Sequence, residues 1–205
     1  MNKEDAEGIV AQLQQAHRIS VAFYRRILPL LDMVAKQLEC TFYYWEPEYT
    51  NRPGRGSSRP SQSSSWDYVP LYSSIHTYKH VADETKTGLE DFGLEFYLNI
   101  EDSFGKTMDK SKRQPDAIRQ PDAIALPAGQ GVLRIHLNRL KNAENASFVE
   151  LWEETAEASV VVGEPWKSVS NHWECRAFEW PLASVICDTG PMVAEIQKHI
   201  LMART

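Results

Sequence analysis

Apolar and small side chains recur every three or four positions from about Asn2 to Glu39. The repeat consists of Ile9, Leu13, Ala16, Ser20, Phe23, Ile27, Leu30, Val34 and Leu38. This spacing places them on one side of an α-helix, so the sequence predicts a long N-terminal helix. A straight helix of that length would span about 54 Å, whereas a domain of this size measures roughly 40 to 45 Å across. Because Pro29 removes one backbone hydrogen bond and clashes with the preceding turn, we expect a kink or a break between Arg25 and Pro29.

The middle of the chain favours strands, and its end favours a helix. Alternating or aromatic-rich segments typical of strands occupy residues 41–49, 94–100, 131–137, 158–162 and 173–182, while 68–78 is extended or helical. Ser147 and Glu150 fit a capping box, which predicts a short helix over residues 148–158. Residues 191–202 carry a helical apolar stripe. The order predicts an α+β fold with a mainly antiparallel sheet, packed by the N-terminal and C-terminal helices.

Two long polar stretches, at about 50–66 and 106–130, interrupt this pattern. The second contains RQPDAI twice in succession, which we interpret as a local duplication within a loop. A chain of 205 residues can bury a core without metals or disulfides, so we expect one domain spanning residues 1–205. The three cysteines, Cys40, Cys175 and Cys187, share no C-x-x-C spacing and are interpreted as small buried hydrophobic residues.

Charge and hydropathy narrow the function. The net charge of −6 disfavours general affinity for nucleic acid or anionic membranes, because both require a cationic face. The N-terminal residues are charged, and no later apolar run approaches the length of a membrane span. We therefore expect a soluble, cytoplasmic protein without a membrane partner.

Two short motifs have a chemical and a structural interpretation. Asp188-Thr189-Gly190 resembles the active-site turn of aspartic proteases, which need two such carboxylates sharing a proton. A helix cap explains the same residues better, because Asp accepts hydrogen bonds from the amides of a helix start. His76 and His80 have the spacing of two metal ligands on one helical face, but no third ligand accompanies them. We interpret them as surface or partly buried histidines and expect no metal or cofactor.

Dispersed carboxylates leave an enzymatic alternative open. Glu95, Glu101, Asp102 and Glu164 lie in or beside predicted strands and loops. Acids on adjacent strands can hold Mg²⁺ and activate water. The alternative function is therefore a metal-dependent, nuclease-like hydrolase whose carboxylates come together only in the fold.

The least ordinary combination is aromatic and basic. Tyr44 and Trp45 precede Arg52, Arg55 and Arg59, with no acidic residue between positions 50 and 65. Guanidinium groups bind carboxylates and phosphates, and neighbouring aromatic rings supply apolar contact. A core role for the aromatic residues and a solvated loop for the arginines is the simpler alternative. We expect a non-enzymatic interaction protein that engages an acidic ligand or another protein through these residues, with possible homo-oligomerisation through the N-terminal helix.

Overall fold

The computed structural model describes residues 3–47, 73–100, 131–153 and 160–203. Both predicted loops, at about 50–66 and 106–130, lie outside these residues, and so does the RQPDAI duplication. The strands are β1 (Thr41–Pro47), β2 (Ser73–His80), β3 (Phe92–Asn99), β4 (Val132–Leu140), β5 (Lys167–Ser168) and β6 (Trp173–Pro181). The helices are α1 (Lys3–Gln37), α3 (Phe148–Glu153), α4 (Leu182–Cys187) and α5 (Gly190–Ala203).

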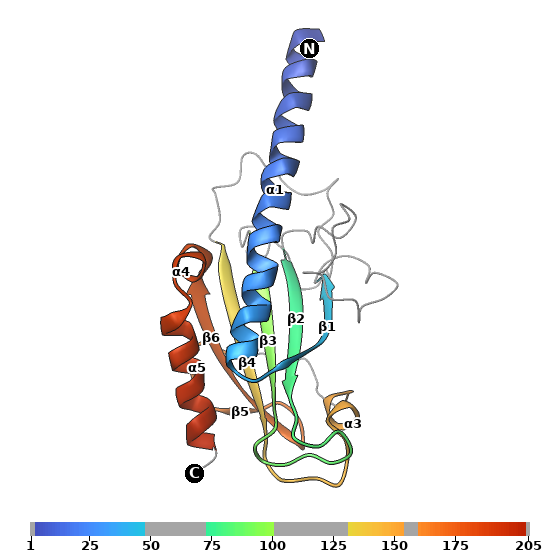
Figure 1. Cartoon of the computed structure of the whole chain (residues 1–205), viewed down its shortest axis with the longest axis vertical. Coiled ribbons are helices and arrows are strands. Elements are labelled where there is room, and N and C mark those ends of the chain that lie inside the picture. The colour runs from blue at the N-terminus through green and yellow to red at the C-terminus, as the bar shows by residue number, and fades with distance from the viewer. Residues whose placement is uncertain (1–2, 48–72, 101–130, 154–159, 204–205) are drawn as a thin grey trace.

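The strands form one six-stranded sheet in the order β1-β2-β3-β4-β6-β5, and all of its neighbouring strands are antiparallel. Together with the terminal helices, this sheet confirms the predicted α+β fold (Figure 1). The strand expected at 158–162 is wrong for its described part, where Val162 makes only an isolated bridge to Ala177. The sequence pattern did not predict α4 or β5.

Helix α1 runs through Pro29 as one element of 35 residues. A break at Pro29 is therefore wrong. Figure 1 shows how the length is accommodated: the C-terminal half of α1 lies across the sheet, and the N-terminal half projects well beyond it. The domain diameter did not limit the helix because the helix leaves the domain.

The main core lies between the sheet and the layer formed by α1 and α5 (Figure 1). Ile27, Leu31 and Val34 of α1 are completely buried. They belong to one cluster with alternate residues of the central strands, including Phe96 and Ile135. Alternation within each strand explains this, because every second side chain points to the same face.

The end of α1 is closed by a tight backbone motif. Glu39 adopts a left-handed conformation with φ of 60°, and Cys40 N–H donates to the carbonyl of Ala35 at 2.9 Å. This is the hydrogen-bond pattern that satisfies the last carbonyls of many helices. The Glu39 carbonyl lies 2.9 Å from Nδ1 of His80, so the turn joins α1 to β2 as well as to β1.

Helix α3 covers one end of the opposite sheet face. Ser147 and Glu150 form the predicted capping box: Ser147 N–H donates to Glu150 Oε2 at 2.8 Å, and Glu150 N–H donates to Ser147 Oγ at 3.3 Å. The helix packs Phe148, Leu151 and Trp152 with Leu140 and Trp173 of the sheet. Over its described length, α3 thus seals a second, aromatic core.

The structure describes Asp188 and all three cysteines. Asp188 lies between α4 and α5, and its Oδ1 accepts a hydrogen bond from Gly190 N–H at 2.8 Å, which confirms the capping role. Cys40 and Cys175 are buried as expected, but Cys187 is exposed. All three cysteines are free.

Gly93→Ala should destabilise the fold. A Cβ at Gly93 would lie 2.2 Å from Cζ3 of Trp152, so the α3 cover would have to shift. Such overpacking costs about 1 to 3 kcal/mol, measurable as a lower free energy of unfolding in urea. Gly8→Ala is the matched control, because a Cβ there meets nothing within 4 Å and should stabilise the helix by about 0.5 to 1 kcal/mol. Equal effects of the two substitutions would contradict the packing of Trp152 on Gly93.

Candidate functional site

A row of polar side chains crosses the sheet on the face away from α1. Antiparallel pairing places Tyr44 beside Thr77, Thr77 beside Glu95, and Glu95 beside His136. Residues paired across antiparallel strands share a face and lie close together. Thr77 is completely buried, and the side chains of Glu95 and His136 are only 14% and 13% exposed. Four strands therefore bring together hydroxyl, carboxyl and imidazole groups that are distant in sequence.

Glu95 is the central acid of this row. Its Oε2 accepts a hydrogen bond from Asn138 Nδ2 at 3.0 Å and lies 3.8 Å from His136 Nδ1. Burial raises the pKa of Glu95 to about 7; the hydrogen bond from Asn138 acts against this rise, and the charge of Glu46 adds to it. Near neutral pH the carboxyl group is therefore poised between its acid and base forms.

His136 is held in its neutral form. Burial, and to a smaller extent the positive charge of Arg134, lowers the pKa of His136 to about 4. Its ring lies 4.4 Å from the ring of Tyr97, and its Nε2 is buried without a hydrogen-bond partner among the described residues. The geometry thus places a titratable carboxyl group beside a neutral imidazole, and the two do not form a permanent ion pair.

The row does not form a metal centre within the part of the chain that the structure describes, since no group of three His, Cys, Asp or Glu residues there could hold a metal ion. His76 and His80 lie on a strand, so the shared helical face that their spacing suggested is absent. His76 is buried, lies 2.9 Å from Ser74 Oγ through its Nε2 and stacks on Trp45. Burial lowers its pKa to about 3, which makes it a neutral core residue.

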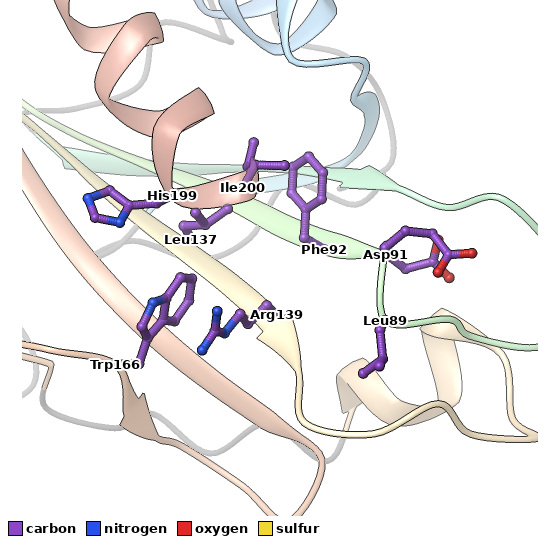
Figure 2. A pocket seen from close by; sticks show the side chains of 9 residues that line it. Leu89, Asp91, Phe92, Leu137, Arg139, Trp166, His199 and Ile200 are labelled. Carbon is purple, nitrogen blue, oxygen red and sulfur yellow. The ribbon is translucent and has the colours of Figure 1, made fainter. Parts of the chain in front are cut away.

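A small cavity lies beneath the C-terminal part of α5, on the other face of the sheet (Figure 2). Its volume is about 10 Å³, roughly the space that one water molecule needs. Arg139 lines it, with its guanidinium 4.0 Å from the centre of the Trp166 ring and its Nε hydrogen-bonded to Glu174. These contacts satisfy the arginine, and the cavity has no room for a larger ligand.

The residues predicted to bind a partner are only partly described. Tyr44 belongs to the polar row, where burial raises its pKa. Trp45 is 3% exposed and lies within the protein against His76. The three arginines, Arg52, Arg55 and Arg59, lie outside the described residues, so their role stays a prediction.

The four carboxylates of the enzymatic alternative are also only partly described. Glu95 occupies the polar row, whereas Glu164 is exposed in the segment before β5. Glu101 and Asp102 lie outside the described residues. Sequence reasoning missed His136 and Asn138 because only the strand register brings them to Glu95.

The projecting half of α1 is the second candidate site. Every described side chain from Glu7 to Ile19 is exposed, including Val10 at 52% and Ile19 at 60%. Among the side chains of α1 that the structure describes, the first buried one is Tyr24, which is 5% exposed. Across the described helices, α1 included, no apolar stretch suffices to cross a membrane.

The fold and these sites define an α+β protein with a six-stranded antiparallel sheet and a projecting N-terminal helix. The chain matches the model of the PM0109 family over residues 3–198, and it belongs to that family. No curated protein matches the chain, and no solved structure matches it. The matched range includes the projecting half of α1.

Glu95→Gln should change how stability depends on pH. The folded state raises the pKa of Glu95 from 4.5 to about 7, so folding binds a proton in this window and stability falls as the pH rises through it. The lowered pKa of His136 has the opposite effect between about pH 4 and 6.5, but it is present in both proteins. Relative to the wild type, the variant should therefore gain about 2.5 kcal/mol between pH 5 and 8.

Urea unfolding at a series of pH values measures this difference. Glu90→Gln, at an exposed carboxylate, is the matched control and should show little change. A constant difference between wild type and Glu95→Gln from pH 5 to 8 would mean that Glu95 titrates normally.

Proposed function

We propose that this protein is an interaction protein and that the projecting half of α1 is its binding element. The observation that carries this proposal is the exposure of every described side chain from Glu7 to Ile19 on a helix that continues well past the sheet. The apolar repeat of Ile9, Leu13, Ala16 and Ser20 continues along this half. In the C-terminal half of α1, members of the same repeat, such as Ile27 and Val34, are buried in the main core.

Helix stability supports this assignment. Helices of about 12 to 15 residues are marginal in water, and packing of an apolar side supplies most of their stability in proteins. Val10 and Ala16 lie near the line of the residues that pack on the sheet, but the sheet does not extend to cover them. A partner that covers this line would supply the missing packing.

The arginine-rich segment is proposed as a second contact. Arg52, Arg55 and Arg59 would attract an acidic ligand or protein, as their sequence context suggests. Tyr44 lies on β1 close to this segment in sequence, while the burial of Trp45 favours a core role for that side chain.

Site-specific photo-crosslinking tests the binding element. A photoreactive amino acid at position 16 should crosslink to a partner in the native host, because Ala16 belongs to the apolar repeat of α1. At position 15, which is exposed on the opposite side of α1, crosslinking should be at least about tenfold weaker. Crosslinks of equal strength at both positions, or none at either, would overturn the proposal. The mass of the crosslinked product separates a second copy of this chain from another protein.

A hydrolase remains the second candidate, and Glu95 favours it. A carboxyl group whose pKa lies near 7, beside a neutral imidazole, is a suitable acid or base for hydrolysis. The nuclease form of this proposal predicts cleavage of single-stranded DNA or RNA in the presence of Mg²⁺. Activity that disappears in Glu95→Gln without loss of folding would support it, and absence of cleavage by the wild type would exclude this form.

A further inference from the structure

We propose that a cleft between two loops at one end of the sheet binds an organic polycation, an aliphatic chain that carries separate ammonium groups. The described residues that line this cleft lie outside α1, so the inference is independent of the proposed function. Three observations carry it: the size of the cleft, an excess of carboxylates around it, and a buried hydroxyl group without a hydrogen-bond partner.

The cleft lies between the loop that joins β2 to β3 and the loop that joins β4 to α3. The first loop contributes residues between 82 and 91, and the second contributes residues 143–145. Figure 1 shows both loops at the end of the sheet away from the projecting half of α1. The volume of the cleft is about 400 Å³, which lies within the range of small-molecule sites. A small organic ligand therefore has room here.

Hydrogen bonds fix the two loops. Thr87 and Glu144 exchange two backbone hydrogen bonds of 3.1 Å each, which joins one loop to the other. Asp91 is buried, and its two carboxylate oxygens accept hydrogen bonds from Ala82 N–H and Gly88 N–H at 2.9 Å each. The protein's own contacts therefore define the shape of the cleft, and a preorganised site lowers the entropic cost of binding.

The lining of the cleft is negatively charged. Its described residues include four acidic side chains, those of Asp83, Glu90, Asp91 and Glu144, and one basic side chain, that of Lys86. Charges of one sign in a concave surface reinforce one another and attract the opposite charge. The cleft therefore favours a cationic ligand.

The arrangement of the acidic groups favours an organic cation over a metal ion. A metal ion needs several ligands within about 2.0 to 2.6 Å, and no group of three His, Cys, Asp or Glu residues in the described part of the chain could hold one. A polyamine carries its charges apart along a chain, so it can reach carboxylates that do not converge. Each ammonium group donates hydrogen bonds and accepts none, which suits a lining rich in acceptors.

Thr87 provides independent support for a ligand that donates hydrogen bonds. This residue lines the cleft and is only 3% exposed. Its Oγ1 is buried and has no hydrogen-bond partner among the described residues. Buried polar groups nearly always have a partner, and a hydroxyl oxygen can accept a hydrogen bond from an ammonium group. A polyamine in the cleft would supply the missing donor.

Isothermal titration calorimetry of the full-length chain with spermidine, a triamine, tests this inference. The expected result is saturable one-to-one binding that weakens between about 0.05 and 0.5 M NaCl, because salt screens the charges. Thr87→Val should raise the Kd at least about tenfold, since it removes a hydrogen bond to a charged group. The urea midpoint of this variant should not fall, because the hydroxyl has no partner within the protein. A lower midpoint with an unchanged Kd would give Thr87 a purely structural role and contradict the inference.

Charge variants separate this site from general attraction to an acidic protein. Glu90→Gln should raise the Kd about threefold or more, whereas Lys86→Gln removes a competing cation and should lower it by a similar factor. Glu164→Gln makes the same charge change at an exposed position outside the cleft and should alter the Kd less than about 1.5-fold. Equal responses of Glu90→Gln and Glu164→Gln would overturn the inference.

Further probes identify the chemistry of the ligand. Butylamine, with a single ammonium group, should bind at least about tenfold more weakly than spermidine. A trilysine peptide presents spaced ammonium groups from a protein source, so its Kd relative to that of spermidine shows whether the cleft prefers a free polyamine or a basic peptide. Displacement of spermidine by an equal concentration of Ca²⁺, or absence of saturable binding by both spermidine and the peptide, would overturn the inference.

Discussion

Burial of the second half of α1 against the central strands is the constraint on which the rest of the structure depends. Ile27, Leu31 and Val34 are inaccessible to solvent, and each fully buried side chain of this size stabilises the fold by about 1.5 to 3 kcal/mol. This packing fixes which face of the central strands is apolar. It also fixes the direction of α1. The apolar repeat of α1 continues towards the N-terminus, but the sheet ends before it. The helix direction that buries the C-terminal half of α1 therefore leaves the N-terminal half exposed.

The opposite sheet face follows from this arrangement. Helices α1 and α5 pack on the side chains of one face of the sheet. Helix α3 covers only one end of the opposite face. Glu95 and His136 lie beyond that aromatic end, where burial is deep enough to shift both pKa values but leaves each side chain partly exposed. A buried acid near neutrality costs stability. The polar row therefore lowers the stability of the fold while holding a titratable carboxyl group within the sheet.

Sequence spacing predicted the elements better than their contacts. The repeat defining α1 and the capping box at Ser147 are local signals, so both could be recognised. His76 and His80 show the limit, because a spacing of four residues places side chains together on a helix but far apart on a strand. The strand expected at 158–162 failed for a different reason: the chain turns at Gly163, whose φ is 83°, so Val162 makes only an isolated parallel bridge to Ala177 before β5 pairs antiparallel with β6. Glu95 and His136 meet only through strand register, which no local pattern encodes.

The projecting helix and the polar row differ in what each requires of the protein. The row is preorganised, since four strands hold it and its groups contact one another without any partner. The projecting half of α1 is not preorganised in this way, because its described side chains from Glu7 to Ile19 are exposed and the sheet does not extend beneath them. The match to the family model begins at residue 3 and so includes this half of α1, which makes it part of the sequence that defines the family. A helix that lies within the matched range and outside the core is therefore the feature of this chain on which the proposed function depends.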